Sequence, residues 1–396
     1  MHVLGRLADR PGAHHGAEGF QVSKVQARAP GAARRPSTRA RNTARDQARA
    51  IGAALALSLL AVGCAAPVAT ESESEGPAAA EGSTLAQIRA RGVLRCAIHP
   101  GQIGMSELTP SGEWRGFTID YCRALAAAVL GDPTKVRFLP TASNKRFTIL
   151  QTGEADVLSR TTTWTLTRDV ELGLNFVGVF YYDGQSFLVK RDEGIESAKD
   201  LDGAAICISK GTTSELNTAD YFSRNGLRYR SVVYENPEEA KLAFFADRCD
   251  AMTTDAFTLT TIRLSDAERP QDYVVLPDYV SREPLGPVVR SDDEQWFDIN
   301  KWVLNALIAA EDLRITQANV ETLRSSSPDP EIQRLLGATP GFGRALGLPE
   351  TWAYQALRAV GNYGEIYERN IAPLGVERGQ NQLTRDGGLM YPLPMR

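Results

Sequence analysis

Residues 146–159 read RFTILQTGEADVLS, and residues 241–253 read KLAFFADRCDAMT. In both stretches a short helix pattern ends in a turn, an apolar strand follows, and hydroxyl-bearing residues stand at the carboxyl end of that strand. The chain therefore contains the same helix–turn–strand unit twice. This repeat predicts a body built from two similar α/β halves.

A second pair of strands precedes these units. One is predicted around Cys96 (VLRCAI, 93–98) and the other around Cys207 (AAICIS, 204–209), each after a turn that contains Gly. A helix is expected after Asn236, because Pro237 and Glu239 follow it as they do at many helix starts. The strands that alternate with helices are thus expected near Val136, Ala155, Ala204, Val232 and Ala251. Alternating strands and helices predict parallel or mixed sheets, with ligands beyond the carboxyl ends of the strands.

Two extended segments set the predicted domain boundaries. The chain leaves the first half at 184–190 (GQSFLVK) and the second half at 283–290 (EPLGPVVR). We therefore expect a second lobe, 185–290, inserted into a first lobe made of 84–184 and 291–396. Two crossings make a two-strand hinge, and a hinge permits closure around a ligand. The returning tail has apolar residues at helical spacing and is predicted to be helical.

The composition is globular, and its charge is unevenly divided. Of the 396 residues 43% are hydrophobic and 23% are charged, which excludes a disordered or fibrous chain. Residues 1–63 carry ten Lys and Arg against three Asp and Glu, whereas the rest carries 34 against 45. An acidic body lacks the basic face that phosphates need, so we expect no nucleic-acid partner.

The basic front end has the layout of a secretory signal. Residues 51–62 read IGAALALSLLAV, an uncharged apolar run that follows several arginines and is too short for a lasting membrane span. The sequence LAVGC (60–64) resembles the lipobox of bacterial lipoproteins, so we expect 1–63 to be a removable targeting segment and Cys64 to carry a lipid. Ordinary cleavage a few residues later, with loss of Cys64, is the alternative. Residues 64–83 are predicted to be a flexible tether.

The remaining cysteines indicate two disulfides in an exported protein. They are Cys96, Cys122, Cys207 and Cys249. Three pairings are open, and the pairing of neighbours would place one bridge in each half. A metal site is poorly supported, because the chain has no CxxC pair and its only His after residue 63 is His99. We expect neither a metal nor a cofactor.

A ligand site is expected where the strand ends of the two halves face each other. Thr161-Thr162-Thr163 and then Arg168 follow one strand, and Thr254-Asp255 follow the equivalent strand. A free amino acid needs a cation for its carboxylate, for which Arg is well suited, and an anion for its ammonium. The turn at 209–214 (SKGTTS) opens a predicted helix, and a helix start suits an anion.

Each of these residues also has a simpler structural interpretation. Asp255 could cap the helix predicted over 256–264. Arg168 could be an exposed ion-pair member beside Asp169, and Trp164 is as consistent with a core position as with a ligand-stacking wall. Their placement at equivalent strand ends of two repeated halves is what favours a binding site.

From about residue 84 to the C-terminus, the chain resembles the periplasmic solute-binding proteins of polar amino-acid ABC transporters, family 3. Within that family it is most similar to the general L-amino-acid-binding branch. The segments that carry the resemblance are GFTIDYCRA (116–124), EADVLSR (154–160), TTWT (162–165), LNF (174–176), YYDGQ (181–185), GTT (211–213), TTD (253–255), EPLGP (283–287) and GNYGEIYERN (361–370). The resemblance implies a type II periplasmic-binding-protein fold.

The resemblance also assigns roles to the site residues. It implies that Arg168 binds the α-carboxylate of an amino acid and that Asp255 binds its ammonium. It implies two disulfides, and it adds further ligand contacts at Thr161, Thr163, Thr212, Thr213 and Met105. The chain departs from the branch at Thr161, where Asn is common, and at Met105, where an aromatic residue is usual.

These observations predict a binding protein rather than an enzyme. We expect a monomer, exported to the periplasm or cell envelope and anchored by the lipid on Cys64, that captures free L-amino acids and delivers them to the membrane permease of an ABC importer. One alternative is a periplasmic enzyme on the same scaffold, of the cyclohexadienyl dehydratase type. The shortage of candidate general acids and bases, with His99 as the only His of the body, argues against it. A ligand-sensing module is the other alternative.

Overall fold

The computed structural model of the protein describes residues 82–396. The predicted targeting segment 1–63, Cys64 and nearly all of the predicted tether 64–83 lie outside the described residues. The described part begins with helix α1 (Thr84–Arg91). Within this part, no helix combines the length and the apolar character needed to cross a membrane.

The first sheet has five strands in the order β4-β1-β5-β14-β6. Strand β1 runs parallel to β4 and β5, whereas β14 runs antiparallel to β5 and β6. The strands are β1 (Leu94–Ile98), β4 (Val136–Pro140), β5 (Val157–Leu158), β6 (Leu174–Phe176) and β14 (Val288–Arg290).

The second sheet repeats this arrangement in the order β10-β9-β11-β8-β12. Strand β9 runs parallel to β10 and β11, and β8 runs antiparallel to β11 and β12. The strands are β8 (Gln185–Lys190), β9 (Ala205–Ser209), β10 (Arg230–Tyr234), β11 (Ala251–Asp255) and β12 (Tyr273–Val275). The prediction of two similar α/β halves with mixed sheets is thus confirmed.

Two aspartates set the register of the repeat. The backbone N–H of Asp156 donates to the carbonyl of Arg95 at 2.9 Å, and its carboxylate accepts the N–H of Arg95 at 2.7 Å. Asp250 makes the same pair of bonds with Ala205, at 2.8 and 2.7 Å. Each aspartate therefore fixes the start of β5 or β11 against the neighbouring parallel strand.

The two disulfides do not follow this repeat. Of the three possible pairings, the structure contains that of neighbours, Cys96–Cys122 and Cys207–Cys249. The first bridge joins β1 to helix α2 (Phe117–Leu130), and the second joins β9 to the turn before β11. Each bridge thus connects a central strand to a different kind of neighbour.

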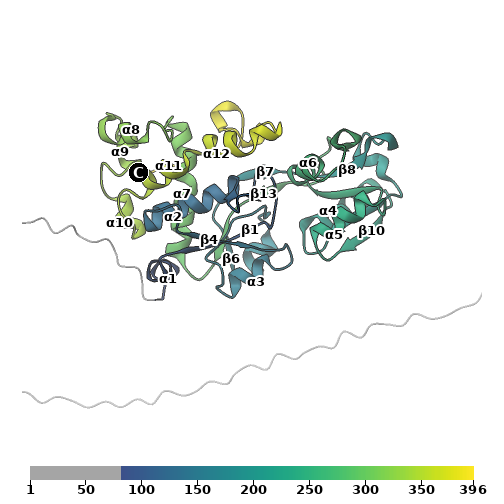
Figure 1. Cartoon of the computed structure of the whole chain (residues 1–396), viewed down its shortest axis with the longest axis horizontal. Coiled ribbons are helices and arrows are strands. Elements are labelled where there is room, and N and C mark those ends of the chain that lie inside the picture. Colours follow the sequence, from purple (N-terminus) through teal and green to yellow (C-terminus); the bar gives the residue numbers. More distant parts are fainter. Residues whose placement is uncertain (1–81) are drawn as a thin grey trace, which may run out of the picture. The chain divides into compact units, whose positions relative to one another are not determined.

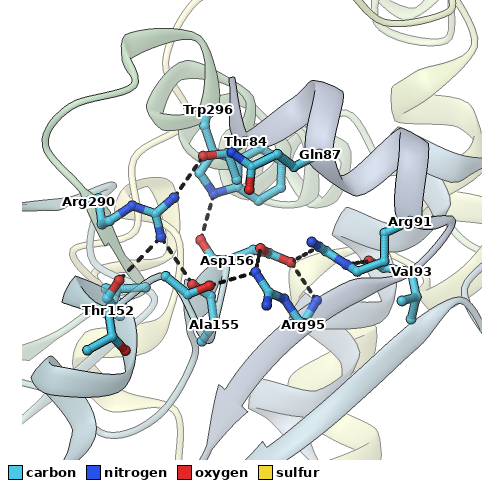
Figure 2. Close-up of polar contacts among 12 residues, drawn as sticks. Thr84, Gln87, Arg91, Val93, Arg95, Thr152, Ala155, Asp156, Arg290 and Trp296 are labelled. Atoms are coloured by element: carbon cyan, nitrogen blue, oxygen red, sulfur yellow. Dashed lines mark hydrogen bonds and ion pairs between the residues drawn. The ribbon is translucent and has the colours of Figure 1, made fainter. Parts of the chain in front are cut away.

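Asp156 also ties the first sheet to its helices (Figure 2). Its carboxylate is 1% exposed and forms ion pairs with Arg91 of α1 and Arg95 of β1. Its backbone carbonyl accepts a hydrogen bond of 2.8 Å from the indole Nε1 of Trp296, in helix α7 (Glu294–Asp312). One buried residue therefore holds two helices and two strands together.

The crossings between the sheets use a short strand pair. Strand β7 (Tyr181–Asp183) pairs antiparallel with β13 (Glu283–Leu285), and Asp183 lies opposite Glu283. We expected the first crossing at 184–190, but 185–190 forms β8, whose first five residues are buried inside the second sheet. The strand that pairs with β13 therefore precedes the expected segment.

Helices cover both sheets. Helices α2, α7 and α11 (Trp352–Val360) pack side by side and, with α1, contribute to the largest cluster of buried apolar side chains in residues 82–396 (Figure 1). Helix α5 begins as predicted, with Asn236 accepting the N–H of Glu239. The remaining helices are α3 (Arg146–Gln151), α4 (Thr213–Asn225), α5 (Pro237–Phe245), α6 (Ala256–Ser265), α8 (Val320–Ser326), α9 (Pro330–Leu335), α10 (Phe342–Leu346) and α12 (Tyr363–Asn370); strands β2 (Glu107–Leu108) and β3 (Trp114–Arg115) form a small hairpin.

Candidate functional site

A cavity lies at the carboxyl ends of the strands of both sheets. His99 follows β1, Thr161 follows β5, Ser209 ends β9 and Asp255 ends β11, and all four line the cavity. This is the location expected for a ligand site in such sheets. Of the seven predicted ligand residues, those that line it are Thr161, Thr163, Arg168, Thr212, Thr213 and Asp255.

Arg168 contributes a buried cation to the cavity. It lies on a short helical turn, Thr167–Glu171, and is 8% exposed. Its guanidinium donates to the carbonyl of Thr163 at 3.0 Å and lies over the ring of Phe147, 5.4 Å from the centroid. Burial lowers the pKa of Arg168, while the charges of Glu283 and Asp255 act in the opposite direction. The alternative of an exposed surface ion pair does not describe this residue.

Asp255 contributes a buried anion, 8% exposed. It stands at the N-cap position of α6, yet its side chain makes no capping hydrogen bond. The first N–H groups of α6 bond to other acceptors instead. The carboxylate of Asp183 accepts the N–H of Phe257 at 3.1 Å, and the carbonyl of Gly184 accepts the N–H of Ala256 at 2.8 Å. The interpretation of Asp255 as a helix cap therefore fails.

The carboxyl groups around Asp255 favour its protonated form. Burial raises the pKa of Asp255 well above its ordinary value, and the charges of Glu283 and Asp183 raise it further. Burial also raises the pKa of Asp183 to about 7, against the two backbone N–H groups that bond to its carboxylate. A cationic group that entered the cavity beside Asp255 would favour its charged form.

Glu283 connects the two sides of the cavity and was not among the predicted site residues. It belongs to crossing strand β13 and is 1% exposed. Its carboxylate accepts hydrogen bonds from the hydroxyl of Thr163 on one side and from Thr213 (3.1 Å) and Asn217 (2.7 Å) of α4 on the other. Ser281 supplies a further hydroxyl donor. Glu283 thereby holds two predicted ligand residues in place.

The predicted turn at 209–214 opens helix α4 at the cavity. Gly211 has φ +71°, which glycine adopts readily, and Thr212 is the N-cap residue. The hydroxyl of Thr212 donates to the carbonyl of Ser209 at 2.7 Å and makes no capping bond. The helix start carries partial positive charge, so Thr213 and Ser214 line the cavity at a position that suits an anion.

Three further residues with ionisable side chains line the cavity and were not predicted as ligand residues: Arg146, Arg160 and His99. Burial lowers the pKa of Arg160 to about 10 and that of Arg146 well below its ordinary value. His99 accepts the N–H of Gly101 on Nδ1 at 3.2 Å. Burial, and next the charge of Arg160, lower its pKa well below 6.5, so His99 is neutral near pH 7. Arg160 could have been predicted as a site residue, because it lies between Ser159 and Thr161 directly after a strand.

Met105 does not line the cavity, contrary to its predicted role. Its side chain is fully buried in the main core, and its carbonyl accepts the N–H and the hydroxyl of Thr118 at 3.0 and 2.8 Å. Gly116 packs so closely on Met105 that a Cβ there would lie 2.2 Å from the Met105 carbonyl oxygen. This backbone packing at the start of α2 fixes Met105 as a core residue. Trp164, 38% exposed, stacks on Phe176 outside the cavity.

Within residues 82–396, no cluster of three or more His, Cys, Asp and Glu side chains could hold a metal ion. The side chains around the cavity instead offer buried charges of both signs, hydroxyl groups and a helix start. This donor set suits a small charged organic molecule.

Comparison with known proteins agrees with this chemistry. The family of bacterial extracellular solute-binding proteins, family 3, matches residues 94–320. The general L-amino acid-binding periplasmic protein AapJ of Rhizobium johnstonii is 49% identical over 326 residues, which cover 81% of this chain and 95% of that protein. The glutamate/glutamine/aspartate/asparagine-binding protein BztA of Rhodobacter capsulatus is 47% identical, over 80% of this chain and 95% of that protein.

A solved structure is similar over the same region. The ABC transporter/periplasmic binding protein of Brucella ovis with glutathione bound is 48% identical, with a TM-score of 0.77, and the match covers 79% of this chain and 99% of that chain. These close relatives are binding proteins rather than enzymes. The chain belongs to the bacterial extracellular solute-binding proteins of family 3.

Proposed function

We propose that this protein is the extracytoplasmic binding component of an ABC importer, which captures a free L-amino acid in the cavity and delivers it to the membrane permease. The observation that carries the proposal is the buried carboxylate of Asp255, which stands at a helix start without capping it and lines one cavity with Arg168. A buried cation and a buried anion in one cavity complement the two charges of a zwitterion.

In the proposed complex, each backbone group of the amino acid has its own partners. Arg168 and the start of α4, at Thr213, would bind the α-carboxylate, and Asp255 would bind the ammonium. Thr161 and Thr163 would add hydrogen bonds from the first sheet. The names of the relatives support this assignment, because AapJ and BztA are both named as amino-acid-binding proteins. Glutathione, bound in the Brucella ovis relative, carries the same two charged groups at its γ-glutamyl end.

We also propose that the ligand closes two lobes about the strand pair β7–β13. They are the predicted lobes, 84–184 with 291–396 and 185–290, except that β14 (288–290) lies in the first sheet and therefore belongs to the first lobe. Arg168 lies between β5 and β6 of the first sheet and Asp255 ends a strand of the second, so a bound zwitterion would contact both lobes. A ligand favours a closed form only through contacts that it lacks in the open form, and a ligand that contacts both lobes at once makes such contacts.

The cellular setting belongs to the same proposal. We propose that the protein works as a monomer in the periplasm, held at a membrane by a lipid on Cys64. Metabolic labelling with a fatty acid should mark the wild-type protein and leave the Cys64→Ser variant unmarked. Labelling that persists in that variant would contradict the anchor.

Calorimetry with each of the twenty common amino acids tests the binding function. We expect heat from at least one, and loss of that heat when the same amino acid is supplied N-acetylated or as its α-amide, since each derivative lacks one charge. Arg168→Gln should abolish binding, whereas Arg228→Gln, at a side chain 84% exposed, serves as the matched control. Folded wild-type protein that binds none of the amino acids would refute the proposal.

A further inference from the structure

Two buried arginines of the cavity form no ion pair within the described residues, although the lowering of their pKa values by burial is opposed by the charge of Asp255. Arg146 is 4% exposed and Arg160 is 2% exposed, and both line the cavity. Arg146 donates to the carbonyl of Gly211 at 3.3 Å, and Arg160 donates to the carbonyl of Thr141 and, at 3.0 Å, to the hydroxyl of Ser143. All these acceptors are neutral, and within residues 82–396 neither arginine forms an ion pair with a carboxylate.

Each of these two arginines also keeps an unused donor. The Nε atoms of Arg146 and Arg160 are buried and have no hydrogen-bond partner within the described chain. A buried guanidinium that lacks an anion is costly, because desolvation removes the water that would otherwise surround its charge. The unused donors and the missing anion point to the same kind of ligand group.

Among the side chains that line the cavity, cations outnumber anions. Three arginines line it, Arg146, Arg160 and Arg168, whereas Asp255 is the one carboxylate among the described residues of the lining; Glu283 and Asp183 do not line it. Once a zwitterion pairs with Arg168 and Asp255, two arginines of the lining remain. A second carboxylate on the ligand would give them an anionic partner.

We propose that Arg146, Arg160 and the hydroxyl of Ser143 form a second anion subsite, so that the preferred ligands carry one carboxylate in addition to the amino-acid head group. This inference rests on the proposed function and narrows its ligand class. The subsite adds buried donors on the first-sheet side of the cavity, from side chains other than those assigned to the α-carboxylate.

Two kinds of ligand could bring a second carboxylate to Arg146 and Arg160. One is an acidic amino acid, through its side chain. The other is a γ-glutamyl peptide, through its distal carboxylate, with its other atoms in a neighbouring hollow that shares lining residues with the cavity. The shared lining residues are His99, Pro237, Thr258 and Ile262. Both sources place a carboxylate and a zwitterionic head group on one ligand.

Calorimetry on the full-length wild-type protein tests the subsite without any substitution. L-Glutamate and L-aspartate are compared with L-glutamine and L-asparagine, and glutathione is compared with its C-terminal amide. We expect at least one carboxylate ligand to bind ten or more times tighter than its neutral partner, because a charge-assisted hydrogen bond is worth roughly twice a neutral one. If the carboxylate ligand is preferred only among the amino acids, the side chain is the source of the second carboxylate. If it is preferred only in the glutathione pair, the peptide is the source.

Variants then assign the preference to the two arginines. Arg146→Gln and Arg160→Gln should each reduce the carboxylate-to-amide preference at least tenfold while the neutral ligand still binds. Arg123→Gln, at an arginine outside the cavity, is the control and should leave the preference unchanged.

Three outcomes would overturn the inference. The first is that the wild-type protein binds neutral ligands as tightly as their carboxylate partners, a result that would leave the proposed amino-acid binding intact. An unchanged preference in both folded arginine variants would also overturn the inference. Absence of binding by any amino acid or by glutathione would refute the proposed function and this inference with it.

Discussion

Replacement of Asp255 with Asn should weaken ligand binding without weakening the fold. Asp255 gives α6 no capping bond, and its pKa is raised by burial and by the neighbouring Glu283 and Asp183. Asn preserves the shape of the side chain, is an equally good N-cap residue and removes a carboxyl group whose charged form is disfavoured by burial. The ligand-free variant should therefore unfold at the wild-type temperature or above it.

The effect on affinity should be large. In the proposed complex Asp255 meets the ammonium of the ligand at a side chain that is 8% exposed. Removal of one partner of a buried charge pair costs about 2–5 kcal/mol. At about 1.4 kcal/mol for each factor of ten, Kd should rise between about 30-fold and about 4,000-fold. Calorimetry with an amino acid that binds the wild type measures Kd, and thermal unfolding of ligand-free protein measures stability.

Asp183→Ala is the matched control, because Asp183 caps α6 and Asp255 does not. At about pH 4, where the raised pKa of Asp183 does not yet destabilise the folded state, loss of that capping bond should lower the free energy of unfolding by about 1 kcal/mol. Measured at that pH, the unfolding temperature should fall below that of the Asp255→Asn variant. The reasoning would be refuted if Asp255→Asn bound ligand within threefold of the wild type. It would also be refuted if that variant lost more stability than the capping variant.

Four other perturbations test the same structure. Amino-acid binding should release protons and weaken as pH falls through the raised pKa of Asp255, which calorimetry in two buffers of different ionisation enthalpy detects; no release would contradict this. Asp183 has a folded-state pKa of about 7, above its unfolded value, so the ligand-free protein should lose stability as the pH rises from about 4 to about 7. In urea unfolding, the Asp183→Asn variant should lose less stability over this range than the wild type, and an equal loss would contradict the role of Asp183. Asp156→Ala should cost about 2–3 kcal/mol in urea unfolding, less than a fully buried pair because Arg91 and Arg95 are 27% and 23% exposed; a loss below 1 kcal/mol would contradict the role assigned to Asp156. Replacing both Cys207 and Cys249 with Ser opens a loop of 42 residues and should cost about 4 kcal/mol, and an unchanged urea midpoint would refute that value.

The sequence predicted the parts of the site that depend on local order along the chain. Arg168 follows β5 and Asp255 ends β11, the equivalent strands of the two sheets, and ligands bind beyond the carboxyl ends of such strands. The strand pattern therefore places each residue at the ligand-binding edge of its own sheet, and the repeat of the two halves predicts that the two edges share one cavity. The start of α5 at Asn236 was predictable for the same reason, since capping depends on residues three positions apart.

The parts that the sequence analysis missed depend on partners far away along the chain. Arg146 lies 65 positions from Gly211, its hydrogen-bond acceptor, and Glu283 lies 120 positions from Thr163. No local pattern shows that such residues meet. Met105 was misassigned because its position is fixed by backbone packing against Gly116, a contact that only the folded chain reveals.

The positions of the strands along the chain have a consequence for the order in which the two sheets fold. All five strands of the second sheet lie within residues 185–275, so that sheet can form from one continuous piece of chain. The first sheet places β14, residues 288–290, between β5 and β6, which end by residue 176. Contacts between distant parts of a chain form slowly, because loop closure costs entropy before the contact is made. We therefore expect the second sheet to become protected from hydrogen exchange first and the first sheet to be completed last.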